Sequence, residues 1–123
     1  MRDAQVGDLL PDATLGQRPA RRIDATAIVI PGAGGLDRYL SRLEDAGTDF
    51  AAWDGRVISL PPDEASAHRV VIADRYGQVY AVVDGDESGL PDVSAMEEWF
   101  RFLATACPEC GVIDDPLGRG WVP

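Results

Sequence analysis

Apolar and polar positions along the chain fall into blocks that predict strands and helices in turn. A β-branched run at residues 26–30 predicts a buried strand, and apolar residues at helical spacing follow it after a glycine-rich turn. The helical pattern continues to Gly55 if Gly47 is tolerated inside the helix; because an internal glycine costs about 1 kcal/mol, a break at Gly47 is the alternative. The apolar positions of this helix are Leu36, Tyr39, Leu40, Leu43, Phe50 and Trp53.

The remaining β-rich segments are short. Residues 1–22 predict a strand or hairpin at a sheet edge, and residues 56–60 predict a strand that ends at two prolines. Residues 69–73 and 78–83 are joined by four residues with Asp74 first and Gly77 last, as a type I turn prefers. These two runs therefore predict a β-hairpin.

Two further helical segments are expected. Asp63 to Ala67 can form one helical turn, with its acidic residues at the positive end. Ser94 and Glu97 have the spacing of a capping box, and the apolar residues after them recur at helical intervals. A helix over residues 94–106 is therefore predicted, and Pro108 disfavours its continuation.

The order of these elements predicts the fold class. A strand-helix-strand crossover makes parallel neighbours, and a hairpin adds an antiparallel pair to the same sheet. This is the plan of an α/β, thioredoxin-like sandwich with a mixed central sheet and flanking helices. We expect residues 1–106 to form this domain and residues 107–123 to form a C-terminal tail.

Two motifs resemble a known family. Val6-Gly7-Asp8, with Pro11-Asp12 and Leu15, is similar to the N-terminal signature of peroxiredoxin-like redoxins, the alkyl hydroperoxide reductase and thiol-specific antioxidant group. Residues 72–80 resemble the Asp-x-x-Gly hairpin of that group. The resemblance covers roughly residues 6–106 and implies thioredoxin-like architecture.

The resemblance also implies where reactive cysteines would stand, and they are missing. The window that matches the turn before the long helix is Ala33-Gly34-Gly35-Leu36, and it holds no thiol. The Pro-x-x-x-Thr-x-x-Cys pattern is absent, and no proline stands directly before His68 or Arg69. Conventional peroxidase or thioredoxin chemistry is therefore not expected. We interpret residues 33–36 as a vestigial active-site turn; the alternative interpretation is an anion site formed by the glycine amides and assisted by Arg38.

The cysteines instead form Cys107-Pro108-Glu109-Cys110, which leaves three interpretations open. The pair is a candidate redox pair, although the negative end of the preceding helix opposes a thiolate. In the second interpretation the pair is half of a zinc site, which would need His68, Asp114, Asp115 or a second subunit to complete it. In the third interpretation the two cysteines have no activity and are either packed in the core or joined as a disulfide.

Two other constellations have weaker interpretations. Asp84, Asp86, Ser88 and Gly89 match the first half of a calcium loop, but Ala95 stands where a glutamate is needed, so a solvated acidic loop is preferred. His68 is the single histidine, and an ordinary strand-edge side chain is preferred to a catalytic one.

Composition narrows the classes of partner. The chain has 123 residues, a net charge of −10 and eleven basic residues, all of them arginine. Such a surface repels polyanions, so nucleic acid and anionic membranes are not expected as partners. No apolar run approaches the length of a membrane span, and a cytoplasmic location is expected. No cofactor is predicted.

Three hypotheses of function follow. The first is a redoxin-like domain without its catalytic turn, which acts as a binding or interaction module for a protein partner. The second is a divergent thiol-disulfide oxidoreductase that acts on a thiol or disulfide substrate through Cys107 and Cys110. The third is a homodimer bridged by zinc through the same cysteines.

Overall fold

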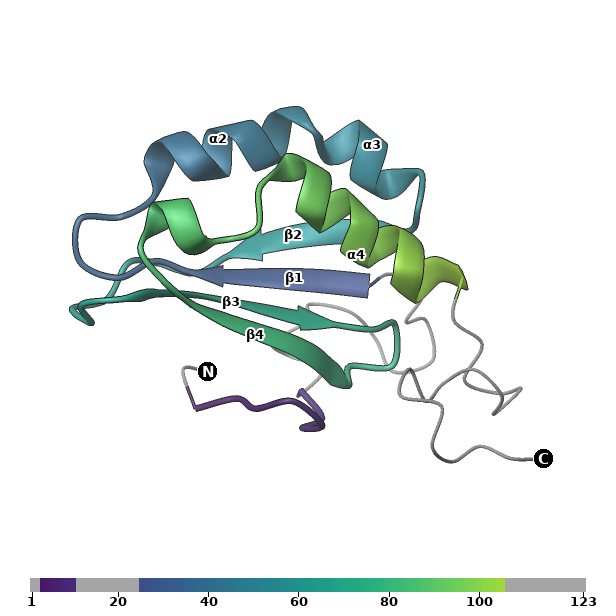
Figure 1. Cartoon of the computed structure of the whole chain (residues 1–123), viewed down its shortest axis with the longest axis horizontal. Coiled ribbons are helices and arrows are strands. Elements are labelled where there is room, and N and C mark those ends of the chain that lie inside the picture. Colours follow the sequence, from purple (N-terminus) through teal and green to yellow (C-terminus); the bar gives the residue numbers. More distant parts are fainter. Residues whose placement is uncertain (1–2, 11–24, 106–123) are drawn as a thin grey trace.

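A computed structural model describes residues 3–10 and 25–105 of the chain, and its strands and longer helices follow the predicted order (Figure 1). The elements are β1 (Ala25–Ile30), α2 (Asp37–Asp45), α3 (Gly47–Ala51), β2 (Gly55–Ser59), β3 (His68–Ala73), β4 (Val79–Gly85), the 3-10 helix η2 (Glu87–Gly89) and α4 (Val93–Thr105). The described residues therefore form a small α/β domain with a four-stranded mixed sheet and three α-helices.

The sheet has the strand order β2-β1-β3-β4. β1 pairs in parallel with β2, and it pairs antiparallel with β3, which continues as an antiparallel hairpin with β4. All six residues of β1 are buried, as expected for a central strand with covered faces. The predicted crossover and hairpin are thus confirmed.

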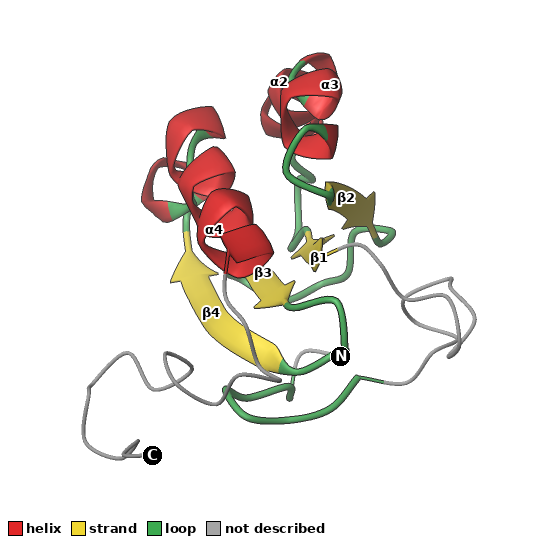
Figure 2. Cartoon of the chain, turned by 90° about the vertical axis from the view of Figure 1, so that its right-hand side faces the viewer, coloured by secondary structure: helices red, strands yellow, loops and turns green. Residues whose placement is uncertain are grey.

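All three α-helices lie on one face of the sheet (Figures 1 and 2). Beneath them, Phe50 of α3 and Phe100 of α4 meet edge to face, with ring centroids 5.2 Å apart. This contact packs α3 against α4 through side chains. Burial of aromatic surface is a main source of stability in such a core. Tyr39, Leu43 and Met96 are buried in the same cluster.

The opposite face of the sheet packs against the N-terminal segment, residues 3–10. Ala4 and Leu10 of this segment are buried against Ile28, Val71 and other apolar residues of the central strands. The segment also reaches the sheet edge, where Leu9 forms an isolated antiparallel bridge with Gln78. The predicted N-terminal strand is therefore a single bridge within residues 3–10, and residues 11–22 lie outside the described part.

An arginine holds this N-terminal segment against the hairpin. The Arg69 guanidinium donates two hydrogen bonds to the Asp84 carboxylate, 2.6 and 3.0 Å long, and a third of 2.9 Å to the carbonyl oxygen of Ala4. A bidentate pair of this kind fixes the orientation of the guanidinium. Asp84 is therefore a structural partner of Arg69 on the neighbouring strand.

The hairpin turn forms as predicted. The Gly77 amide donates to the Asp74 carbonyl oxygen at 3.0 Å, and the Asp74 carboxylate accepts from the amides of Tyr76 and Gln78. Gly77 has a φ of 85°, in the region that favours glycine. Asp74 is buried, so its three roles as acceptor satisfy oxygens that would otherwise be costly to bury.

Three local predictions need correction or a choice between alternatives. The helical pattern breaks at Gly47: α2 ends at Asp45 and a separate helix begins at Gly47. Residues 63–67 form no helical turn, because the Asp63 amide donates to the Pro31 carbonyl oxygen and the Asp63 carboxylate accepts from the Ala65 amide. The predicted capping box is also wrong, since Asp92, not Ser94, accepts from an amide of the first turn of α4, that of Ala95.

The Phe100 ring lies so close to Gly55 that a larger residue at position 55 is predicted to destabilise the protein. A methyl group there would lie within 2.6 Å of three ring carbons of Phe100, so Gly55→Ala must displace a buried ring. We expect the free energy of unfolding to fall by about 1–3 kcal/mol, as overpacking of a core typically costs. Urea denaturation followed by circular dichroism measures this loss.

Gly47→Ala is the matched control, because it adds the same methyl group where no atom lies within 4 Å. We expect it to be neutral or to stabilise the protein by up to about 1 kcal/mol, given the helix propensity of alanine. Equal effects of the two substitutions would contradict the packing argument.

Candidate functional site

The candidate site is the β1–α2 turn, defined as residues 31–36, together with the loop of residues 61–67 and His68. The turn leaves the central strand at the sheet end where α2 begins (Figure 1). Ala33 is exposed and Leu36 is buried. The position in which the family resemblance expects the first cysteine is therefore accessible, and it carries a methyl group.

The amides of the turn are already engaged. The Gly32 amide donates to Nδ1 of His68 at 2.8 Å, and the Ala33 amide donates to the Ala65 carbonyl oxygen at 2.9 Å. The Gly35 amide donates to the carbonyl oxygen of Gly32 at 3.1 Å. These three donors are not available to hold an anion, which disfavours the anion-site alternative for the turn.

Gly32 allows the turn and the loop to approach closely. A Cβ at this position would lie 2.5 Å from the carbonyl oxygen of Ala65 and 2.7 Å from that of Ala67. No real Cβ atom tolerates such distances to backbone atoms. Only glycine can therefore occupy this position while the loop stays where it is.

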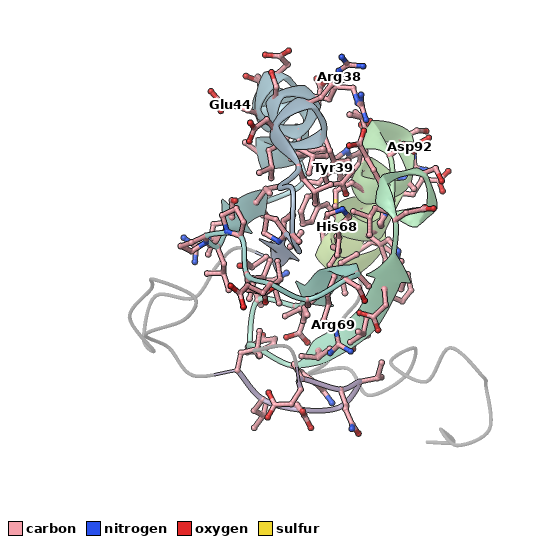
Figure 3. The ribbon with its side chains drawn as sticks, turned by 90° about the vertical axis from the view of Figure 1, so that its left-hand side faces the viewer. Arg38, Tyr39, Glu44, His68, Arg69 and Asp92 are labelled. Atoms are coloured by element: carbon pink, nitrogen blue, oxygen red, sulfur yellow. The ribbon has the colours of Figure 1, made fainter. Side chains whose placement is uncertain are left out.

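His68 is a positioning residue at this junction. Its Nδ1 accepts from Gly32, so the neutral ring carries its hydrogen on Nε2. The residue, labelled in Figure 3, begins β3, and it pairs with Gly85 of β4. The sequence showed no partner for His68, and the structure supplies one 36 positions away.

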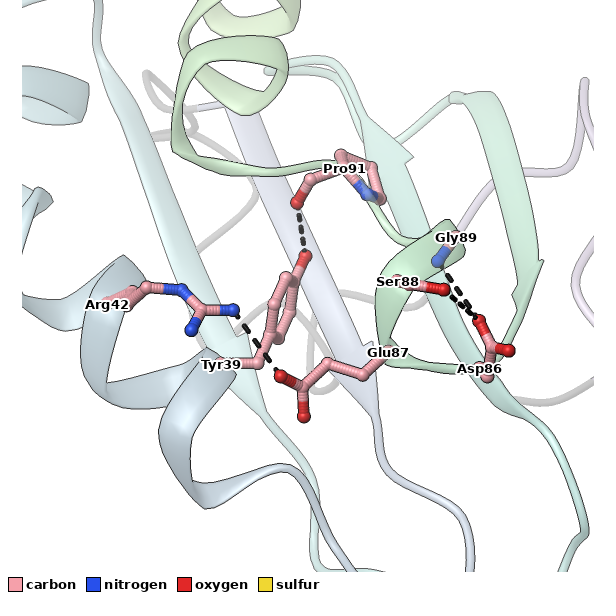
Figure 4. Close-up of polar contacts among 7 residues, drawn as sticks. All are labelled: Tyr39, Arg42, Asp86, Glu87, Ser88, Gly89 and Pro91. Atoms are coloured by element: carbon pink, nitrogen blue, oxygen red, sulfur yellow. Dashed lines mark hydrogen bonds and ion pairs between the residues drawn. The ribbon is translucent and has the colours of Figure 1, made fainter.

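The acidic loop after β4 is capped by its own side chains (Figure 4). The Asp86 carboxylate accepts from the Ser88 hydroxyl at 2.8 Å and from the Gly89 amide at 3.2 Å. These hydrogen bonds lower the pKa of Asp86. Because Asp84 pairs with Arg69 and Asp86 caps η2, the structure agrees with the preferred acidic-loop interpretation.

Tyr39 ties α2 to the loop that precedes α4. Its buried hydroxyl donates to the Pro91 carbonyl oxygen at 2.7 Å, and Arg42 lies 3.4 Å from the Glu87 carboxylate on the same side (Figure 4). Burial raises the pKa of Tyr39 to about 12, an effect that Arg42 opposes and that Asp92 and Glu87 reinforce. Tyr39 is therefore a neutral hydrogen-bond donor that holds two elements together.

The predicted cysteine site falls elsewhere in the chain. Cys107 and Cys110 lie outside the described residues, as do Asp114 and Asp115, so the redox and zinc hypotheses stay predictions. Within residues 3–10 and 25–105, no three histidine, cysteine, aspartate or glutamate side chains are grouped closely enough to hold a metal ion.

Two grooves lie away from the turn, and sequence analysis identified neither. One, of about 390 Å³, lies between α2, α3 and the outer strand β2, with Leu40 and Phe50 in its wall. The other, of about 450 Å³, lies between α4 and β4 and is lined by Tyr80, Trp99 and Phe102 among others. The signal for the second was present as apolar residues three positions apart, Trp99 and Phe102, on the helix.

Comparison of the chain with protein-family models, with curated proteins and with solved structures finds no match. In the part that the structure describes, no helix is both long enough and apolar enough to cross a membrane.

The hydrogen bond between Gly32 and His68 predicts that substitutions of His68 lower stability to different extents. His68→Leu leaves a buried amide without its acceptor, which typically costs about 1–3 kcal/mol. His68→Asn keeps an acceptor near the position of Nδ1, and we expect it to retain most of the stability. Urea denaturation measures both, and faster hydrogen exchange of the Gly32 amide in His68→Leu alone identifies the bond. Equal losses in the two variants would contradict this assignment.

The raised pKa of Tyr39 predicts an alkaline loss of stability. The unfolded chain ionises this phenol near pH 10, whereas the folded chain keeps the proton until about pH 12. The folded state therefore binds more protons in this window, and the free energy of unfolding falls by roughly 2–3 kcal/mol as the pH rises through it. Below pH 10 this contribution is fully present.

The measurement is urea denaturation at pH 9 and pH 12 for the wild type and for Tyr39→Phe. The variant lacks the ionising group, so its loss between the two pH values is smaller by the amount stated. Tyr76→Phe, which alters a side chain that is 41% exposed, should behave like the wild type. Identical pH dependence in all three proteins would rule out a special role for Tyr39.

Proposed function

We propose that the chain is a thioredoxin-like domain of the peroxiredoxin-like kind, which binds a protein partner and performs no chemistry at the β1–α2 turn. The observation that carries the proposal is the turn itself. Its exposed positions are Ala33 and Gly34, and the amides of Gly32 and Ala33 are engaged by His68 and Ala65. A thiolate would need a sulfur here, and the described turn has none; with the amides of Gly32 and Ala33 engaged, the positive end of α2 would be left to stabilise one.

The topology supports the thioredoxin-like part of the proposal. A parallel β1–β2 pair joined by helices, followed by an antiparallel β3–β4 hairpin and a last helix, is the predicted plan. The helices of the described part cover a single face, and residues 3–10 lie on the other. The turn stands directly after the central strand, where that plan positions chemistry.

The two motifs behind the family resemblance also contact each other. The Gly7 amide donates to the Val79 carbonyl oxygen at 2.9 Å, and the Val79 amide donates to the Asp8 carbonyl oxygen at 2.8 Å. The Leu10 amide donates to the carbonyl oxygen of Gly77 at 2.8 Å. Two segments about seventy positions apart thus form one small unit, which supports treating them as parts of one signature.

Catalytic assays test the proposal. We expect the wild type to reduce neither insulin disulfides, with dithiothreitol as electron donor, nor hydrogen peroxide above the uncatalysed rate. Cys107→Ser should behave identically. Turnover by the wild type that is lost in Cys107→Ser would overturn the proposal and favour the oxidoreductase hypothesis.

A thiol introduced into the turn tests whether the position before α2 lowers the pKa of a cysteine. In a Cys107→Ser, Cys110→Ser background, the thiol of Ala33→Cys lies just before the positive end of α2, and that of Thr105→Cys lies at the negative end of α4. We expect iodoacetamide to alkylate the first thiol faster at pH 7, because its pKa is lower. Equal rates would show that the turn lacks the electrostatics of a redoxin site.

A further inference from the structure

The groove between α4 and β4 has a distinctive set of side chains. It is lined by Tyr80, Ala95, Glu98, Trp99 and Phe102. Among the described residues, three aromatic rings, one small residue and one carboxylate therefore border an open groove of about 450 Å³. This volume is large enough for a side chain of a partner molecule.

The rings of the groove support one another. Phe102 lies edge to face with both Tyr80 and Trp99, at centroid distances of 6.2 and 6.0 Å. Phe102 is nevertheless 39% exposed. The rings are thus held in place by each other while part of their surface faces solvent.

The chemistry of the groove favours a cation. The faces of aromatic rings carry negative electrostatic potential, and Glu98 adds a full negative charge. Glu98 is exposed and forms no ion pair within the described ranges. The chain as a whole carries a net charge of −10, which attracts basic partners from a distance.

We infer that this groove binds an arginine side chain of a basic segment in a partner protein. The guanidinium is planar, so it stacks on an aromatic face while its N–H groups reach the Glu98 carboxylate; a lysine ammonium is a compact point charge that does less of both. The same chemistry occurs within the domain, where the Arg101 guanidinium lies 6.0 Å from the centroid of the Trp53 ring. The inference rests on the proposed binding function and names its partner chemistry.

Peptide titration tests the inference with the full chain labelled with ¹⁵N. The probes are acetyl-Gly-Ser-Arg-Ser-Gly-amide and the same peptide with lysine or citrulline in place of arginine. We expect the arginine peptide to shift the Trp99 indole signal with saturation and the lysine peptide to bind more weakly. Citrulline has nearly the same shape without the charge, so it should not bind.

Matched variants locate the site. We expect Trp99→Leu and Glu98→Gln each to weaken binding of the arginine peptide about tenfold, which corresponds to about 1.4 kcal/mol. Tyr76→Leu removes an exposed ring outside the groove, and Glu97→Gln removes the neighbouring charge, so both should bind like the wild type. Phe102→Leu, at an exposed position, gives a second ring variant should Trp99→Leu unfold.

Several results would overturn the inference. These are equal binding of the arginine and citrulline peptides, no saturable shift, or equal affinity of Glu98→Gln and Glu97→Gln. Tighter peptide binding by Arg119→Ala would show that the chain's own arginine occupies the groove. Concentration-dependent shifts of the Trp99 signal without peptide would identify a second copy as the occupant. None of these results involves turnover, so they are distinguishable from failure of the proposed function.

Discussion

The domain depends on how closely the β1–α2 turn approaches the loop before β3. Gly32 lies so near the carbonyl oxygens of Ala65 and Ala67 that no side chain fits there. Hydrogen bonds from Gly32 to His68 and from Ala33 to Ala65 hold the two backbones at this distance. The end of the parallel β1–β2 unit is thereby joined to the beginning of the antiparallel hairpin.

This constraint explains why the turn keeps a defined shape without reactive groups. A redoxin turn must present a sulfur to solvent and direct amides toward it, whereas here the amides are used to hold the loop. The buried Tyr39 hydroxyl donates to the Pro91 carbonyl oxygen and so holds the start of α2 to the loop before α4. Structure at this end of the sheet is therefore maintained by backbone contacts and by two positioning side chains, His68 and Tyr39.

The sequence allowed the elements to be predicted better than the contacts between them. The β-branched run at residues 26–30 and the Asp74-to-Gly77 turn have local causes, and both appear as expected. The pattern of residues 63–67 predicts a helical turn, which does not form because the backbone of this loop pairs with Pro31, a contact that no local pattern shows. No local pattern shows the partner of His68 either, since Gly32 lies far away in the chain.

The apolar residues of helix α4 contribute to two surfaces, the buried core and a partly exposed aromatic groove. Met96, Phe100 and Leu103 are buried against the sheet, as the helical spacing predicted. Trp99 shares that spacing but lies at the side of the helix, where it joins Phe102 and Tyr80 at the outer strand. Tyr80 and Trp99 pack against the core with part of their surface, and Phe102 is 39% exposed beside them, so this second aromatic surface contributes less to folding than a fully buried one would. Its position next to an exposed carboxylate is more readily understood through recognition of a cation than through stability.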